Sequence, residues 1–250
     1  AVDWECTVYL NGNELGSHKG GYTPFSFDIT EFITEGENTV VLRVLDDTGN
    51  MLQPSGKQSN AYFAYGCLYP RCTGIWQTVW LEFVPKTYIK NLKMTPDIDR
   101  ECVDVQIDLA GNCDLGEITA LVSFKGSAVS ASKCRVNGDK ASITLPVPSP
   151  QLWDIGQPNL YDVIFTAGED AVVSYFGMRK VSIEKNCIKL NNRTIFLRFV
   201  LDQGYYPDGI YTAPNDNALK HDIELSMKAG FNGARMHMKA FEPRFIYHAD

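Results

Sequence analysis

The sequence has no dense run of lysine and arginine, and its formal net charge is −7. A protein that binds the phosphate backbone needs concentrated positive charge, so this composition argues against a nucleic-acid partner. No apolar stretch approaches the roughly 18 residues that a membrane-spanning helix requires, so no membrane partner is expected either. The acidic balance mainly favours solubility.

Cysteine is present, but without a metal-binding pattern, because no Cys-x-x-Cys pair occurs. Neither a metal site nor another cofactor is therefore predicted. Scattered cysteines are typical of buried, reduced thiols in an intracellular protein, which favours the cytoplasm over the periplasm or secretion. A signal peptide is not visible, but the chain opens in what reads as the middle of a domain, so the localisation is otherwise unknown. The seven cysteines are Cys6, Cys67, Cys72, Cys102, Cys113, Cys134 and Cys187.

Alternating apolar residues dominate the first three quarters of the chain and predict a mainly β protein. In residues 1–86, short strands are separated by turns such as Asn11-Gly12, and Trp76 and Trp80 are expected to pack in the core of a closing strand. A second all-β segment covers residues 87–184. About seven short strands in roughly 100 residues predict an immunoglobulin-like β-sandwich there.

The periodicity changes at residue 185. Residues 194–197 form a compact apolar run, which predicts a strand buried on both faces. A helix is expected from Asn215 to a stop at Gly230, followed by a short strand over 231–238 and another helix from Glu242-Pro243. Strand–loop–helix–strand–helix is the repeat of a (β/α)₈ TIM barrel.

A complete barrel of this kind has roughly 250 residues. Residues 185–250 supply only two of its eight strands, so this barrel is expected to be truncated and the parent protein to continue well past Asp250. The first sandwich is expected to be incomplete at its N-terminal end, because the chain opens inside a strand.

Several blocks of sequence, taken in order, resemble glycoside hydrolase family 2, the group of β-galactosidases, β-glucuronidases and their relatives. The resemblance implies a jelly-roll, sugar-binding-like domain over 1–86, an immunoglobulin-like sandwich over 87–184 and the start of the catalytic barrel over 185–250. The blocks are Val8–Gly12, Gly20–Phe25, Phe27–Thr30, Gly74–Glu82, Leu152-Trp153, Pro158–Tyr161, Phe176–Arg179, Leu190–Asn192, Phe196–Arg198 and Phe231–Arg235.

The resemblance also implies a retaining β-glycosidase that acts on a β-linked saccharide with two glutamates, about 5–5.5 Å apart, from later barrel strands. The acid/base of the family lies in an Asn-Glu pair, which the barrel portion here lacks. Glu184, Glu224 and Glu242 are expected to be solvated, so no catalytic residue is assigned and the chain alone is predicted to be inactive. An oligomer is possible in the full-length protein, and the sequence does not identify the sugar.

Candidate substrate-binding residues follow the two barrel strands, because active sites of such barrels lie at the C-terminal ends of strands. By resemblance, Arg235 braces the nucleophile, although an ordinary surface arginine is the alternative. His237 points to the same side and is either a sugar ligand or a structural histidine. Asp202, Gln203 and Tyr205 either contact sugar hydroxyls and ring faces or hold their own loop.

Two further candidates come from the loop that precedes Gly74. By resemblance this loop reaches the active site, where Tyr69 and Arg71 would contact sugar. The alternative function for the whole chain is a non-catalytic carbohydrate-binding or scaffold module. The enzyme fragment is favoured, because a binding module has no use for a quarter of a barrel.

Overall fold

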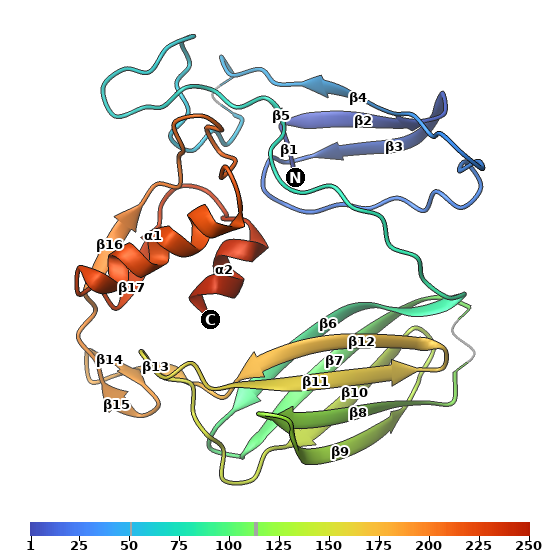
Figure 1. Ribbon diagram of the computed structural model, residues 1–250, viewed down its shortest axis with the longest axis vertical. Coiled ribbons are helices and arrows are strands. Elements are labelled where there is room, and N and C mark those ends of the chain that lie inside the picture. The colour runs from blue at the N-terminus through green and yellow to red at the C-terminus, as the bar shows by residue number, and fades with distance from the viewer. Residues whose placement is uncertain (51, 113–114) are drawn as a thin grey trace. The chain divides into compact units, whose positions relative to one another are not determined.

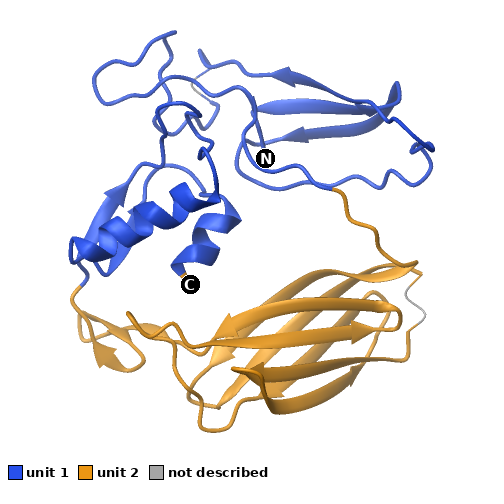
Figure 2. Cartoon of the chain, viewed as in Figure 1, with its two compact units in different colours: residues 1–80, 197–249 blue, residues 81–196, 250 orange. Residues whose placement is uncertain are grey.

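The computed structural model describes residues 1–50, 52–112 and 115–250, so Cys113 lies outside the described residues. The chain is mainly β, as predicted, with 45% strand and 8% helix. It divides into two compact units (Figure 2). Unit 1 combines residues 1–80 with residues 197–249, and unit 2 comprises residues 81–196 together with Asp250.

Unit 2 contains a sandwich of two antiparallel sheets (Figure 1). One sheet has the order β10-β7-β6 and the other has the order β12-β11-β8-β9. Their strands are β6 Thr87–Asp97, β7 Cys102–Gly111, β8 Glu117–Phe124, β9 Ser127–Arg135, β10 Lys140–Pro146, β11 Leu160–Ala167 and β12 Asp170–Gly177.

The core of this sandwich follows directly from the alternation in its strands. Every second residue of β7 from Val103 to Leu109 is buried, and β8 and β11 bury every second residue in the same way. These side chains form one apolar cluster between the two sheets. Because each fully buried aliphatic or aromatic side chain contributes about 1.5–3 kcal/mol, the cluster is the main source of stability in unit 2.

The apolar run at 194–197 is not a buried strand, so that prediction is wrong. Strand β15, Arg193–Thr194, ends where the run begins, and it belongs to a small antiparallel sheet with β13, Val181–Glu184, and β14, Cys187–Leu190. The backbone of Ile195 continues this pairing by donating to the carbonyl of Ile188, and Phe196 is 80% exposed.

The first part of unit 1 contains strands β1 to β5. Asn11 and Gly12 join β2 to β3 with φ angles of 51° and 84°, as the Asn-Gly turn predicts. Trp76 is buried, as expected, but Trp80 is 62% exposed, because β5 ends before the predicted alternation reaches it. The strands are β1 Val2–Asp3, β2 Glu5–Leu10, β3 Asn13–Lys19, β4 Val40–Leu45 and β5 Gly74–Ile75, with sheet orders β1-β5 and β3-β2-β4.

The second part of unit 1 is a β–α–β–α segment. Strands β16, Phe199–Asp202, and β17, Gly233–Met236, pair in parallel and are joined through helix α1, Asp216–Lys228. The side chain of Asn215 caps α1 by accepting from the backbone of Ala218 at 3.0 Å, which confirms the predicted start. Helix α2, Pro243–Ala249, also begins as predicted.

Neither helix of the described chain is long and apolar enough to cross a membrane. The six described cysteines are free, but only Cys6 and Cys102 are buried. The prediction of buried thiols is therefore wrong for Cys67 and Cys187, which are exposed.

Candidate functional site

The C-terminal ends of β16 and β17 lie side by side. Asp202 pairs with Met236, and the backbone of His237 donates to the carbonyl of Asp202 at 2.9 Å. The loops that leave these strands, 203–213 and 237–242, therefore start from one edge of the parallel pair. Three predicted candidates, Asp202, Gln203 and His237, are brought together at this edge.

A long loop from the first part of unit 1 contacts the loop that follows β16. The ring of Tyr69 stacks on the ring of Tyr205, with centroids 3.9 Å apart and planes inclined by 13°. Thr212 donates a hydrogen bond to the carbonyl of Trp76 at 2.8 Å, and the rings of Trp76 and Tyr211 lie 5.1 Å apart. The structure thus joins two candidates, Tyr69 and Tyr205, that are distant in the sequence.

A pocket of about 250 Å³ opens beside the stacked pair. The Tyr206 hydroxyl donates to the Asp222 carboxylate at 3.1 Å, which leaves mainly ring faces and aliphatic carbon on the lining. Such a surface suits the apolar face of a pyranose or another flat group. The lining residues are Tyr69, Pro70, Tyr205, Tyr206, Pro207 and Ile210.

Asp202 and Gln203 offer polar atoms next to the stacked pair. Asp202 accepts a hydrogen bond from the backbone of Gly204 at 2.8 Å, and burial raises the pKa of its carboxyl above the usual value. The side-chain oxygen of Gln203 is buried and has no hydrogen-bond partner among the described residues. A buried acceptor without a partner is rare, so the Gln203 oxygen is suited to accept a hydrogen bond from a hydroxyl group of a ligand.

Arg235 and His237 differ from their expected environments. The Arg235 side chain is exposed rather than buried, and it forms no ion pair with a carboxylate of the described chain. Desolvation, together with the charges of Arg235 and Lys57, lowers the pKa of His237, so its ring is mainly neutral near pH 7. A neutral ring can accept and donate one hydrogen bond, as a sugar hydroxyl requires.

Arg71 is engaged within its own loop. Its Nε donates to the carbonyl of Ala61 at 3.0 Å, a terminal nitrogen donates to the Thr48 hydroxyl, and the guanidinium lies 4.2 Å from the ring of Tyr62. Arg71 therefore holds the shape of the loop that presents Tyr69.

The three glutamates of the last segment are each paired with a cation. Glu184 binds Lys189, and Glu224 lies 3.8 Å from Lys220. The prediction of solvated glutamates is wrong for Glu242, which is only 6% exposed and accepts from the Arg244 guanidinium at 2.9 Å. Tertiary packing at the start of α2, rather than helix position alone, decides this burial.

Sequence reasoning missed Lys239, the cation that lies among the aromatic residues of this site. Its ammonium lies 4.3 Å from the ring centroid of Tyr211 and 4.9 Å from that of Phe241. Burial lowers the pKa of Lys239 to about 8. The only sequence signal was a lysine in a strand-end segment otherwise rich in methionine and phenylalanine.

A buried carboxylate, Asp3, was also missed. Asp3 is 1% exposed, and it accepts from the Gln58 amide at 2.7 Å, while the Gln58 oxygen accepts from the backbone of Cys72 at 2.6 Å. A Cβ atom on Gly21 would lie 2.6 Å from the other carboxylate oxygen, so only glycine fits there. Burial raises the pKa of Asp3 to about 6.

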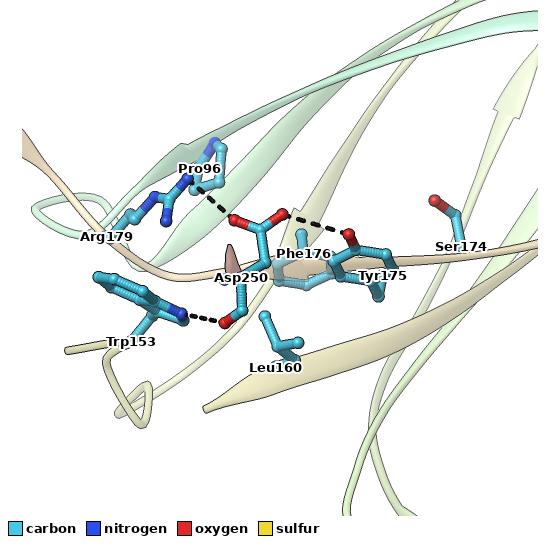
Figure 3. A pocket seen from close by; sticks show the side chains of 9 residues that line it. Pro96, Trp153, Leu160, Ser174, Tyr175, Phe176, Arg179 and Asp250 are labelled. Carbon is cyan, nitrogen blue, oxygen red and sulfur yellow. Dashed lines mark hydrogen bonds and ion pairs between the residues drawn. The ribbon is translucent and has the colours of Figure 1, made fainter. Parts of the chain in front are cut away.

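A second pocket, of about 430 Å³, lies in unit 2 and contains none of the predicted site residues. Figure 3 shows that the Asp250 carboxylate lies between Arg179 and Tyr175, at 3.3 and 3.2 Å. The indole of Trp153 donates to the Asp250 backbone oxygen at 2.5 Å. The cation that this pocket could offer to an anionic ligand is therefore already paired. The described residues contain no group of three or more His, Cys, Asp or Glu that could hold a metal ion.

Comparison with known families matches most of the chain. Residues 1–82 match the profile described as "Glycosyl hydrolases family 2, sugar binding domain". Residues 87–179 match the profile described as "Glycosyl hydrolases family 2".

Curated relatives carry the names of β-glycosidases. A "Putative beta-glucuronidase" of Formosa agariphila is 30% identical over 94% of this chain and 29% of its own length. A "Beta-galactosidase" of Leuconostoc mesenteroides is 28% identical over 92% of this chain and 23% of its own length. The chain thus spans about a quarter of the length of these relatives.

Solved structures share the fold. The apo structure of the β-glucuronidase from Ruminococcus gnavus aligns with a TM-score of 0.79 at 19% identity, and it covers 100% of this chain and 43% of that chain.

Proposed function

This chain belongs to glycosyl hydrolases family 2, and we propose that it is part of a retaining β-glycosidase that contributes to sugar binding but does not hydrolyse a glycosidic bond by itself. The observation that carries the proposal is the stacking of Tyr69 on Tyr205. It joins the region that matches the family's sugar-binding profile to the ends of the parallel strands, where barrel enzymes bind substrate.

The architecture that we propose has three parts: a jelly-roll domain over 1–86, an immunoglobulin-like domain over 87–184 and the first two units of a (β/α)₈ barrel over 185–250. The two antiparallel sheets of unit 2 support the second part. The parallel pairing of β16 with β17 through α1 supports the third, because parallel strands joined by a helix are the repeat of such a barrel.

Within this site we assign different roles to the polar and aromatic candidates. Tyr69 and Tyr205 present ring faces to the apolar side of the sugar, while Asp202, Gln203 and His237 bind its hydroxyl groups. Arg235, which is exposed here, would brace a carboxylate from another part of the parent enzyme, and Arg71 acts by supporting the loop of Tyr69.

The proposed lack of hydrolysis rests on the carboxylates. A retaining mechanism needs two carboxyl groups about 5–5.5 Å apart, one of them with a raised pKa. Glu184 and Glu224 form surface ion pairs, and Glu242 is held by Arg244. The Arg244 guanidinium donates two hydrogen bonds to one carboxylate oxygen of Glu242, so this carboxyl group is already engaged within the chain.

Hydrolysis is tested with the purified chain and a panel of 4-nitrophenyl β-glycosides that includes the galactoside and the glucuronide. Release of 4-nitrophenolate is expected to equal that of a heat-denatured sample. Turnover above that background, abolished by Glu242→Gln, would falsify the proposal that this chain lacks a catalytic carboxylate.

Sugar binding is tested by titrating methyl β-galactoside and methyl β-glucuronide against the chain while recording protein NMR spectra. Tyr205→Ala is expected to weaken binding by about two- to tenfold, because one aromatic contact contributes about 0.5–1.5 kcal/mol. Tyr88→Ala, in β6 of unit 2, is the matched control and should leave binding unchanged. Equal losses in both variants, or no binding to the unmodified chain, would contradict the proposed role.

A further inference from the structure

The ammonium group of Lys239 lies inside a cage of aromatic rings. Its nitrogen is 4.3 Å from the ring centroid of Tyr211, 4.9 Å from Phe241, 5.3 Å from Trp76 and 5.4 Å from Tyr205. All four distances are within the range in which a cation is attracted to the face of an aromatic ring. Because Trp76 comes from the first part of unit 1, this one cation contacts three separate segments.

No carboxylate forms an ion pair with Lys239 in the described chain. The ammonium donates to the carbonyl of Gly204, while the charges of Asp202 and Glu242 act on it without contact, and the Cys72 thiol also faces it. Glu242 is already paired with Arg244. A partly buried cation without a paired anion is uncommon, because the free energy lost on desolvation exceeds what the attraction of the ring faces recovers.

The loop after β16 is packed closely against this cation. Gly204 is buried with a φ of +61°, and a Cβ atom there would lie 2.7 Å from Lys239 Cε and 2.7 Å from the ring of Phe241. The ring of the neighbouring Tyr205 lies 5.4 Å from the Lys239 ammonium and stacks on the ring of Tyr69. The position of the stacked pair is thus coupled to the position of the ammonium.

We propose that Lys239 is a positioning residue whose caged ammonium clamps the loops after β16 and β17 against Trp76, and thereby holds Tyr205 in stacking contact with Tyr69. The consequence for sugar recognition rests on the proposed function of this pocket. The clamp itself is a property of the described chain and is tested without any sugar.

The charge, rather than the length of the side chain, holds the clamp. Ring faces attract an ammonium but not a neutral amine, and the Gly204 carbonyl receives a stronger hydrogen bond from the charged form. Lys239 is charged at neutral pH and loses its proton near pH 8. The clamp should therefore loosen over the same interval, although folding stability rises there because the cost of burying a charge disappears.

The test is a near-ultraviolet circular dichroism titration of the full chain from pH 6 to 10, which reports the packing of tyrosine and tryptophan rings. The unmodified chain is expected to show a spectral step centred near pH 8. Lys239→Met should abolish the step and reproduce the high-pH spectrum at every pH, whereas Lys239→Arg should retain the low-pH spectrum throughout.

Lys228→Met, at the exposed end of α1, is the matched control and should keep the step. Burial lowers the pKa of the Ala1 α-amino group, but this group is present in every variant, so its contribution is the same in all the spectra that are compared. A step that persists in Lys239→Met, or none in the unmodified chain, would overturn the proposal. If the arginine variant fails to fold, the methionine and control variants still decide the result.

If Lys239 only supported the fold, the melting temperature and the aromatic spectrum would respond differently to its replacement. Lys239→Met should melt at the same temperature as the unmodified chain or higher at pH 7, while its aromatic spectrum changes. Loss of both stability and spectrum would show that Lys239 only supports the fold. If the step behaves as expected but no methyl β-glycoside binds at any pH, the clamp stands and the proposed function fails.

Discussion

The two units of this chain bury very different kinds of side chain. The sandwich of unit 2 has one cluster of buried apolar residues, and its ion pairs, such as Lys133–Glu117 and Arg100–Asp104, lie on the surface. Among the buried polar residues of the described chain, Asn191 is in unit 2. The other five, Asp3, Gln53, Gln58, Ser59 and Glu242, are in unit 1.

The difference indicates a division of roles between the units. An apolar core between two sheets stabilises a fold without further requirements, whereas buried carboxylates and cations reduce stability unless every partner is present. In unit 1, Glu242 and Lys239 lie in the segment that follows β17, which also carries the candidate His237, whereas Asp3 lies in β1. Natural proteins depart from the rules of stable packing mainly at functional sites, which supports the site proposed in unit 1.

The largest expected effect is in the apolar core of unit 2. Phe165→Ala should destabilise this unit by about 3–5 kcal/mol, because the ring is fully buried between the two sheets. Urea denaturation followed by far-ultraviolet circular dichroism measures it. Val173→Ala, on the exposed face of neighbouring β12, should change stability by less than about 0.5 kcal/mol. Equal losses in the two variants would remove the basis for treating unit 2 as a single apolar core.

The second largest effect is expected from Asp3, the buried carboxylate of unit 1, and concerns the pH dependence of stability. The pKa of Asp3 is about 6 in the folded chain and 3.8 in the unfolded reference, so the folded state binds more protons between these values. Its contribution to stability is therefore most favourable below pH 4 and falls by about 2–3 kcal/mol as the pH rises past 6.

Asp3→Asn should remove this dependence and make unit 1 more stable than the unmodified chain at pH 7 by a similar amount. The measurement is urea denaturation at pH 4 and pH 7, with the exposed Asp208→Asn as control. An Asp3→Asn variant that is less stable at pH 7 would show that the carboxylate is compensated by a partner.

The third effect is local to helix α1. Asn215→Ala removes the acceptor for the backbone of Ala218 and should destabilise unit 1 by about 1 kcal/mol. Asn217→Ala, two residues later on the exposed surface of the same helix, should be neutral or slightly stabilising, since alanine is the better helix former. Thermal unfolding followed by circular dichroism at about 222 nm, where helical peptide groups absorb, distinguishes the two variants.

The smallest effect is expected on the surface of unit 2. Lys133→Ala breaks a 3.3 Å ion pair with Glu117 between two exposed side chains, and should change stability by less than about 1 kcal/mol. The stability difference between Lys133→Ala and the unmodified chain should disappear in 1 M salt, where the screening length is about 3 Å. A larger, salt-insensitive loss would mean that surface charges also stabilise this unit and would weaken the contrast with unit 1.

Sequence reasoning predicted the local features of both units. Alternation identified the buried face of β7, because residues of a strand point alternately to its two sides whatever the strand packs against. Asn215 identified the start of α1, because a cap acts on the backbone only three residues away. Local rules failed where the chain left its regular element, as at Phe196 and Trp80, both of which are exposed.

For the candidate site, the sequence by itself identified Tyr69 and Tyr205 as aromatic candidates and placed Asp202 and His237 near the C-terminal ends of two strands. Only the tertiary structure decided that the two rings stack, that Lys239 lies among four aromatic groups and that Asp3 and Glu242 are buried. The physical reason is that burial and ring geometry depend on segments far apart in the chain, so no pattern within a single segment encodes them.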